Sequence, residues 1–250
     1  MKNTFTISIL FIALFVTIAI SCAKESKAPV AVDYSFSEEF DTVSNAIAKG
    51  WVIANNTRPI GTMGWVQGYF YVSLYHGLAL DKLGLGYPSN YAYGGGFSGN
   101  SPAASGTDFI MTTSDCGFGV ANCSNWLISP VLTVKNGDVV NFYTRTYGNP
   151  AIAADRLEVR MNEVNNTADV GRDSNSVGGF TKVLLDINSK FLLSGAGSYP
   201  GKWTKYQIRV SDVPIAKKTR IGFRYYVPDG GPQGNNGLGI GIDNFIFSSN

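Results

Sequence analysis

Apolar and polar residues alternate with a period of two along most of the chain beyond residue 33. Leu157, Val159 and Met161 alternate with charged residues, and the run 138–147 is rich in β-branched and aromatic side chains. This period is typical of a β-strand with one buried face. Similar runs cover 34–40, 65–74, 109–113, 126–132, 181–187, 205–210, 220–227 and 238–247.

Turn-forming residues separate these runs, and no segment has a convincing amphipathic-helix pattern. About ten strands joined by turns predict an all-β sandwich of two antiparallel sheets. Two stretches do not fit strands, because 84–106 is rich in Gly, Ser, Tyr and Asn, and 229–237 consists almost entirely of turn formers. Long loops in a compact domain are uncommon unless they are functional or mobile. Both are therefore the first candidates for a binding edge.

The N-terminus has a different pattern, an apolar run over 9–20 preceded by the positive charge of Lys2. This run is shorter than the ~18 residues that a membrane-spanning helix needs and has the length of a signal peptide. It ends in the sequence AISC over 19–22, which resembles the bacterial lipobox. The alternative is an ordinary secretory signal that happens to have Cys22 nearby.

We therefore expect a lipoprotein signal peptide over 1–21, a lipidated Cys22 with a flexible tether over 22–33, and a folded domain over 34–250. A lipid on Cys22 would anchor the protein to a membrane without spanning it. The expected location is the cell envelope, on the outer membrane of a Gram-negative bacterium. The sequence leaves open which leaflet is anchored and whether the protein is exposed at the cell surface.

Composition is consistent with a single exported β domain. The formal net charge is only +2, which supplies no basic footprint for nucleic acid. Charged residues make up 15% of the chain and aromatic residues 13%, a profile typical of secreted β-sandwiches. The length suits one large domain with an ample core.

Two cysteines remain after Cys22, namely Cys116 and Cys123 in the segment CGFGVANC. An even number of cysteines in an oxidising compartment predicts a disulfide between them. Two free buried thiols are the alternative. The only histidine, His76, lies far from this segment, so a Cys/His metal site is not expected.

Four short motifs occur in a characteristic order: FSEEFD over 36–41, GW over 50–51, NWLISP over 125–130, and IGIDN over 240–244. Together they resemble the choice-of-anchor J family, which is related to the cleaved adhesin modules of gingipains and to MAM-like domains. The resemblance implies a jelly-roll β-sandwich on exported proteins, serving adhesion or ligand binding rather than catalysis. The glycine- and tyrosine-rich insertion after His76 departs from the family pattern and leaves the ligand in doubt.

The resemblance also implies a calcium site. In the resembling modules, the glutamate of the first motif and the aspartate of the last lie close together, which nominates Glu38 and Asp243 as ligands of Ca²⁺. Carboxylates and loop carbonyls are the ligands that this ion prefers. Asn244 stands where a second aspartate is common and would weaken such a site. The alternative is that both acids only cap strand ends or pair with an arginine.

Aromatic residues gather in and after the predicted strand 65–74. The candidate ligand-binding residues are Trp65, Tyr69, Tyr71, Tyr91, Tyr93 and Asp229. Aromatic faces stack on sugar rings, and Asn, Gln and Asp side chains supply hydrogen bonds. Strand alternation would turn Val66, Gly68 and Phe70 toward the core and leave the aromatic candidates on the other face. The alternative is that these aromatic residues only pack beneath the loop.

No catalytic motif accompanies these features, because the chain has a single histidine and lacks the G-x-S-x-G nucleophile signature. The sequence predicts a non-catalytic envelope module for adhesion or for binding carbohydrate or another ligand. Its partner would be a glycan or a surface protein, with the membrane contacted only through the lipid. The alternatives are a structural or assembly subunit and, less favoured, a glycoside hydrolase that uses two carboxylates.

Overall fold

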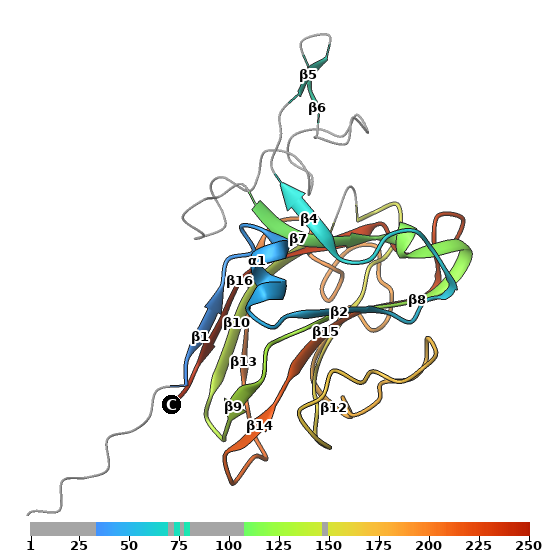
Figure 1. Cartoon of the computed structure of the whole chain (residues 1–250). Coiled ribbons are helices and arrows are strands. Elements are labelled where there is room, and N and C mark those ends of the chain that lie inside the picture. The colour runs from blue at the N-terminus through green and yellow to red at the C-terminus, as the bar shows by residue number, and fades with distance from the viewer. Residues whose placement is uncertain (1–33, 70–72, 76–77, 81–107, 147–149) are drawn as a thin grey trace, which may run out of the picture. The chain divides into compact units, whose positions relative to one another are not determined.

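The computed structural model describes residues 34–69, 73–75, 78–80, 108–146 and 150–250. These residues belong to one unit that starts at residue 33 and contains two six-stranded antiparallel sheets packed face to face (Figure 1). This arrangement confirms the predicted all-β, jelly-roll sandwich. In the described part of the chain, no helix has the length and apolarity to cross a membrane. Cys22 and the tether lie outside the described residues.

The first sheet has the strand order β13-β10-β16-β7-β4, and β1 also pairs with β16. Its strands are β1 (Phe36–Glu38), β4 (Val66–Tyr69), β7 (Asp108–Thr113), β10 (Val139–Thr146), β13 (Thr204–Arg209) and β16 (Gly239–Ser248). The first half of β16 pairs with β7, and its second half pairs with β1. The two ends of the chain's folded part therefore lie side by side in the middle of this sheet.

The second sheet has the strand order β12-β11-β15-β8-β2, and β3 also pairs with β8. Its strands are β2 (Val52–Asn55), β3 (Arg58–Ile60), β8 (Gly117–Ile128), β11 (Leu157–Met161), β12 (Lys182–Ile187) and β15 (Ile221–Gly230). The edge strands β12 and β13 follow one another in the chain and lie on corresponding sides of the two sheets.

The smaller elements lie outside the two large sheets. They are helix α1 (Val43–Ala48), the 3-10 turn η1 (Ser114–Cys116), and the two-stranded pairs β9 (Leu132–Val134) with β14 (Lys217–Thr219) and β5 (Ser73–Tyr75) with β6 (Leu78–Leu80). The hydroxyl oxygen of Thr42 caps α1 by accepting a 3.2 Å hydrogen bond from the backbone N–H of Asn45. With a single full turn, α1 is too short to show a helical period, which explains why alternation did not predict it.

Most strands lie where alternation predicts them. β11 coincides with the predicted run 157–161, and β10 occupies most of 138–147. β8 differs from the prediction, since it ends at Ile128 and extends backward to Gly117. Pro130 follows closely and lacks the N–H that a continuing ladder needs. The short β2 was not predicted.

The main core lies between the sheets. Residues Phe223, Tyr225 and Val227 of β15 face it, as do Ile240 and Ile242 of β16. Trp51 lies near its centre and makes edge-to-face contacts with Phe40 and Phe245 at ring-centroid distances of 5.0 and 5.2 Å. Such aromatic pairs add to the free energy gained by burial alone.

A β-bulge in β16 shifts the alternation. Asn244 and Phe245 together stand opposite Phe142, because Asn141 pairs with Ile246 and Tyr143 pairs with Asp243. Asn244 has a φ of 49°, a left-handed conformation that Asn tolerates better than most residues. The bulge keeps both Ile242 and Phe245 in the core.

Each sheet also has a covered outer face. On the second sheet, the segment 162–181 covers Trp126 and Ile128, which pack with Val170 and Phe180. On the first sheet, Phe109, Met111 and Trp203 form a separate buried cluster. Neither outer face is therefore an open sheet surface at these positions.

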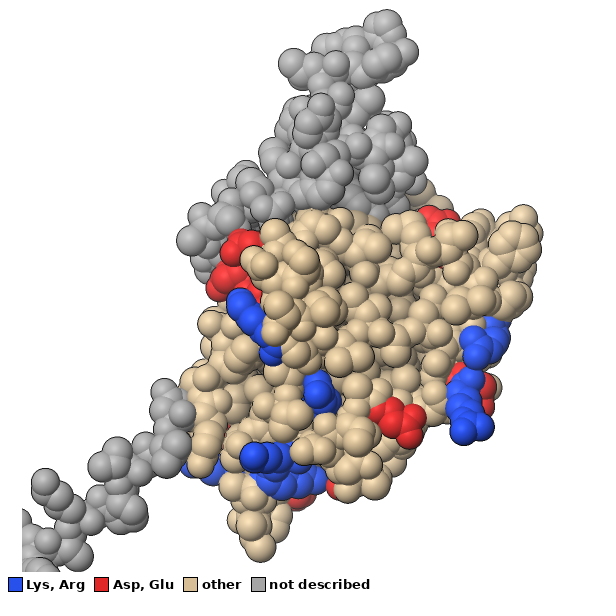
Figure 2. Space-filling view, in the orientation of Figure 1, with Lys and Arg blue, Asp and Glu red and all other residues tan. Residues whose placement is uncertain are grey.

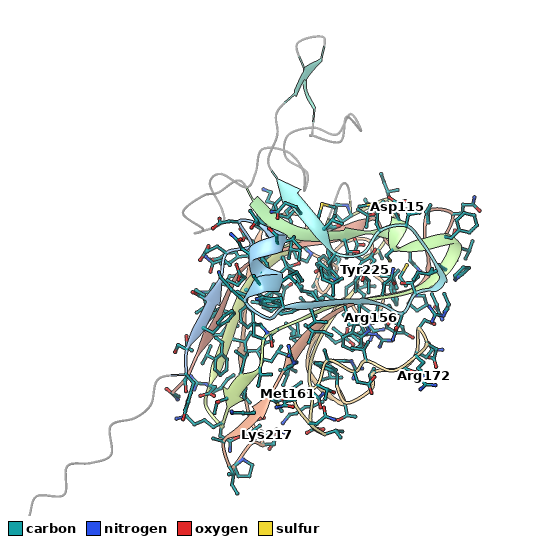
Figure 3. The ribbon with its side chains drawn as sticks, in the orientation of Figure 1. Asp115, Arg156, Met161, Arg172, Lys217 and Tyr225 are labelled. Atoms are coloured by element: carbon teal, nitrogen blue, oxygen red, sulfur yellow. The ribbon has the colours of Figure 1, made fainter. Side chains whose placement is uncertain are left out.

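A buried carboxylate joins the two sheets at one end of the sandwich. Asp155 precedes β11 and accepts hydrogen bonds from the hydroxyl groups of Thr146 in β10 and Tyr225 in β15, the latter at 2.8 Å. The backbone N–H groups of Leu238 and Gly239, at the start of β16, each donate to it at 2.9 Å. Figure 3 shows Tyr225 between the two sheets. Burial raises the pKa of Asp155 to about 6, although these hydrogen bonds oppose the shift.

Because its pKa lies above the ordinary value of 3.8, folded Asp155 holds its proton more tightly than the unfolded chain does. Relative to an Asp155→Asn variant, wild-type protein should lose up to about 3 kcal/mol of unfolding free energy as pH rises from about 4 to about 6. The difference should be constant above that range. Urea denaturation across pH measures it, and a pH-independent difference would contradict the assignment. Asp155→Ala, which strands several buried donors, should cost more than about 3 kcal/mol at any pH.

Candidate functional site

The predicted loop 229–237 connects β15 of the second sheet to β16 of the first, and β15 itself continues to Gly230. This loop lies against the first residues of β8. The backbone N–H of Gln233 donates to the carbonyl of Gly119 at 3.1 Å, and Gly230 pairs with Ala121. Two segments far apart in the sequence therefore form one edge of the sandwich.

Apolar side chains are exposed at this edge. Phe118 is 71% exposed, Val120 is 55% exposed, and Ile60 of β3 is 56% exposed. Ile60 stands opposite Gly117, so it neighbours Phe118. Asp229, Gln233 and Asn235 add exposed polar groups to the same edge. We call these six residues the loop edge.

Asp229 is part of this edge, as its candidate role requires. Its Oδ2 accepts a 2.7 Å hydrogen bond from the side-chain amide of Asn235, and its carbonyl accepts from the backbone N–H of Asn236 at 3.0 Å. Asp229 has a φ of 52° and starts the turn. The carboxylate therefore shapes the loop while remaining exposed to a ligand.

Hydrogen bonds hold the end of the 229–237 loop where it enters β16. Gly237 donates its N–H to the carbonyl of Ala154 at 3.0 Å, and the next two N–H groups bind Asp155. Gly237 has a φ of 82°, and a Cβ there would lie 2.5 Å from the hydroxyl of Tyr225. Only glycine fits this position, so the buried Asp155 network fixes where the loop edge begins.

The predicted aromatic platform is wrong at Trp65. Its side chain is only 3% exposed and belongs to the main core. The predicted faces of this segment are reversed, because Val66 packs with the outer cluster around Phe109, and a Cβ on Gly68 would lie 2.3 Å from the Phe109 ring. The outer face of the first sheet is itself apolar, so hydrophobicity did not identify the inner face.

The other aromatic candidates are less fully described. Tyr69 is the last residue of β4, and nothing is stated of its side chain. Tyr71, Tyr91, Tyr93 and the predicted loop 84–106 lie outside the described residues. Their role in binding remains a prediction.

Glu38 and Asp243 are both buried and lie on the paired strands β1 and β16. Glu38 Oε2 lies 3.1 Å from the ammonium of Lys49, and Glu38 Oε1 accepts from the backbone N–H of Phe40 at 3.2 Å. Asp243 Oδ1 accepts a 2.8 Å hydrogen bond from the backbone N–H of Asn244. Protein groups therefore already satisfy part of each carboxylate.

Negative charge accumulates around this pair. Burial raises the pKa of Glu39, and the nearby carboxylates of Asp41 and Glu38 raise it further. The side-chain amide of Asn244 donates to Glu39 at 3.1 and 3.3 Å. Within the described ranges, however, no three His, Cys, Asp or Glu side chains converge as a metal site would require. Lys49 already pairs with Glu38, and calcium at Glu38 and Asp243 stays a prediction from the resemblance.

Cys116 and Cys123 are free thiols in the structure rather than the predicted disulfide, and both are fully buried. The two thiols nevertheless contact each other. A hydrogen bond with Cys123, together with burial, raises the pKa of the Cys116 thiol. Thr57 also donates its hydroxyl to the Cys116 sulfur at 3.7 Å. The disulfide between them stays a prediction from the sequence.

Sequence reasoning missed a charged network on the outer face of the second sheet. Glu158 accepts from Arg156, Arg160 and Arg224 at 2.8, 2.7 and 3.0 Å. Burial acts to raise the pKa of Glu158, but the arginines outweigh burial and hold the pKa below its ordinary value. The alternating R-x-E-x-R sequence over 156–160 was the available signal. The period-two pattern predicts only one buried face for β11, whereas the segment 162–181 also covers the face that carries these charged side chains.

The network holds the covering segment in place. Arg224 lies 3.8 Å above the ring of Tyr226 and donates to the carbonyl of Ser174, while the Tyr226 hydroxyl donates to Asn175 at 3.0 Å. The charged groups of Glu158 and of its arginine partners therefore bind one another and the covering segment. We therefore regard the network as structural support rather than as a ligand site.

A cavity of about 420 Å³ opens between the edge strands β12 and β13. Leu185, Asn188 and Tyr206 are among its lining residues, and Asp186 is its single carboxylate. Arg156 binds Asp186 through two hydrogen bonds of 2.6 and 2.9 Å. A retaining or inverting glycosidase needs two carboxylates flanking its substrate, so this cavity does not supply that arrangement.

No protein-family model matches the chain, and no curated protein matches it. Among solved structures, the K1 cleaved adhesin domain of Lys-gingipain from Porphyromonas gingivalis W83 is similar, with a TM-score of 0.50 and 19% identity over 86% of this chain and 98% of that domain. The K3 domain from the same source has a TM-score of 0.46 and 16% identity, covering 88% of this chain and 100% of that domain.

A carbohydrate-binding module of the β-sandwich superfamily has a TM-score of 0.41 and 12% identity, covering 84% of this chain and 60% of that one. Of these three structures, only the K1 domain reaches a TM-score of 0.50, and at 19% identity its similarity supports a conclusion about the fold alone. The chain therefore has an adhesin-like β-sandwich fold.

Protein exported to an oxidising compartment should contain the predicted Cys116–Cys123 disulfide. Thiol titration after unfolding should detect no reactive cysteine from the pair before reduction and both after it. Reduction should lower the free energy of unfolding by about 2–3 kcal/mol. A Cys116→Ser/Cys123→Ser double variant, whose stability should not respond to reductant, is the control. Full thiol reactivity of freshly exported protein would contradict the prediction.

Proposed function

We propose that this protein is a lipid-anchored, non-catalytic recognition module of the cell envelope that binds a glycan or a surface protein through the loop edge. Cys22 carries the lipid, and the anchored membrane is the outer membrane of a Gram-negative bacterium. The motifs over 36–41, 125–130 and 240–244 support membership of the choice-of-anchor J family. The chain acts by binding and has no reaction to catalyse.

The observation that carries this proposal is the exposure of Phe118. A phenyl ring that is 71% exposed is unusual on this sandwich, because the described tryptophans and most of the other described phenylalanines are buried. Gln233 lies beside Gly119, the residue after Phe118, and Asp229 is exposed in the same loop as Gln233, so the edge supplies an amide and a carboxylate. An aromatic face beside hydrogen-bonding groups is suited to a sugar ring or to a protein surface.

The orientation of the domain supports the same role. The chain enters the sandwich at β1, at the end where β16 also finishes (Figure 1). Asp115, next to the start of β8, lies at the opposite side of the molecule from Lys217 (Figure 3). The loop edge and the point where the chain enters the sandwich therefore lie on opposite sides of the folded unit. The neighbouring K1 fold, named as an adhesin domain, is consistent with a binding site at the loop edge.

A second candidate is an assembly subunit of an envelope complex. The three exposed apolar residues Ile60, Phe118 and Val120 favour it, because adjoining apolar side chains on a protein surface often mark protein contacts. The two candidates differ in the partner and share the surface. A partner that copurifies through the loop edge, without any glycan binding, would identify the second.

The Phe118→Ala variant should lose binding. A screen of the chain from Ala23 onward against a glycan array and against envelope extract identifies the ligand, and titration with the variant should then give an affinity at least about tenfold weaker. Val164→Ala removes an equally exposed apolar side chain from another part of the surface and should bind normally. Unchanged binding by Phe118→Ala would exclude the loop edge.

The same titration tests calcium. We measure binding and melting temperature with Ca²⁺ and with a chelator, on wild-type protein and on a Glu38→Gln variant. Calcium held by Glu38 and Asp243 would link β1 to β16, so chelation should lower the melting temperature of the wild-type protein and have little effect on Glu38→Gln. A wild-type melting temperature that does not respond to the chelator would contradict the calcium prediction.

A further inference from the structure

The end of the sandwich where the chain enters carries several basic residues. Lys217 and Lys218 of β14 stand opposite Val134 and Thr133 of β9. Lys135 follows β9 directly, and Arg209 ends β13 and donates to the carbonyl of Gly137 at 3.1 Å. We call Lys135, Arg209, Lys217 and Lys218 the basic end.

These residues form one surface with the point of chain entry. Asn250 donates its backbone N–H to Asp138 at 2.9 Å, and Ser249 donates to the hydroxyl oxygen of Ser35 at 3.1 Å. Ser35 directly precedes β1, so the entering chain lies beside the 135–138 turn. Figure 2 shows Lys and Arg atoms gathered at this lower end, where Figure 1 draws the ends of β9 and β14.

None of the four cations has an ion-pair partner among the residues that the structure describes. Three acids lie among them: Asp138 is buried, Asp212 pairs with Lys182 at 3.4 Å, and the carbonyl of Glu163 accepts from Lys217 at 3.4 Å. With Lys182 included, the cations outnumber these acids. The basic end therefore presents an excess of positive charge.

An apolar residue projects from the same end. Ile215 lies in the turn between β13 and β14, two residues before Lys217, and is 81% exposed. The turn is held from behind, since Val213 is buried and its N–H donates to Asn136 Oδ1 at 2.6 Å. An exposed apolar tip bordered by lysines is the combination that binds the interface of an anionic bilayer.

The proposed anchor brings this end to a membrane. From Cys22 to Tyr34 the chain can span at most about 40 Å when fully extended, roughly the width of the domain itself. Because the tether joins the domain at the entering end, the lipid stays within about 40 Å of the basic end. For its orientation, this step rests on the proposed lipid anchor at Cys22.

We infer that the basic end is a membrane-contact surface, which binds anionic phospholipid headgroups with Lys135, Arg209, Lys217 and Lys218 and inserts Ile215 at their level. The contact turns a flexible attachment into a defined orientation. The loop edge, on the far side, is then presented away from the bilayer.

The test uses the chain from Ala23 onward, which contains the whole compact unit but no lipidated cysteine. We measure cosedimentation with vesicles of phosphatidylcholine alone and of phosphatidylcholine with phosphatidylglycerol, at low and high salt. Binding should occur only to the anionic vesicles and should be lost at high salt, since salt screens exposed charges. Lys217→Glu/Lys218→Glu should lower the partition coefficient by at least about 20-fold. Ile215→Ser should lower it several-fold.

Lys202→Glu/Lys205→Glu is the matched control. It makes the same change in net charge with two exposed lysines near the other end of β13, and it should keep wild-type partitioning. Equal losses in both double variants would reduce the effect to net charge and overturn the assignment. So would the absence of binding to anionic vesicles at low salt. Phe118→Ala should bind vesicles normally, so failure of the loop edge as a ligand site is distinguished from failure of the membrane contact.

Discussion

The carboxylate of Asp155 is the interaction on which this sandwich and its candidate site both depend. It binds Thr146 of the first sheet, Tyr225 of the second, and the two backbone N–H groups that open β16. Because a buried carboxylate without hydrogen-bond partners would be strongly destabilising, moving any of these four donors away from Asp155 would lower the free energy of unfolding. The network thereby ties the two sheets together at the end where the loop edge begins. Asp155 thereby fixes the position at which the 229–237 loop of the loop edge ends.

The covering of both outer sheet faces explains why the ends of the sandwich carry the exposed features. On the second sheet, Arg224 and Tyr226 hold the segment 162–181 over Trp126. On the first, Phe109 and Trp203 form a buried cluster of their own. Binding of a partner to these faces would require removal of well-packed protein. The exposed apolar side chains lie instead at the second residue of β8, Phe118, and in the turn between β13 and β14, Ile215.

Alternation along the sequence predicted most of the fold, because a strand with one apolar face produces the same pattern wherever it lies in a sheet. β11 shows this well, with Leu157, Val159 and Met161 buried as expected. Alternation could not decide between faces where both are covered, and so it misassigned Trp65. The short elements α1 and β2 are defined by tertiary contacts, since neither is long enough for its own period to be recognised. The ion pairs of Glu158 likewise depend on strands that are distant in the sequence.

The candidate site was half predictable for the same reason. The turn-rich sequence of 229–237 identified one loop, but Phe118 was read as part of a cysteine-closed segment and not as an exposed ring. Its position between two glycines, which allow the backbone to turn the ring outward, was the signal available. Exposure of Phe118 and burial of Cys116 and Cys123 belong together: the thiols occupy the interior of the same short segment, so the intervening aromatic residue projects to solvent. The two buried cysteines therefore fix the ends of the segment from which Phe118 projects, and the exposure of the ring depends on how this segment packs into the core.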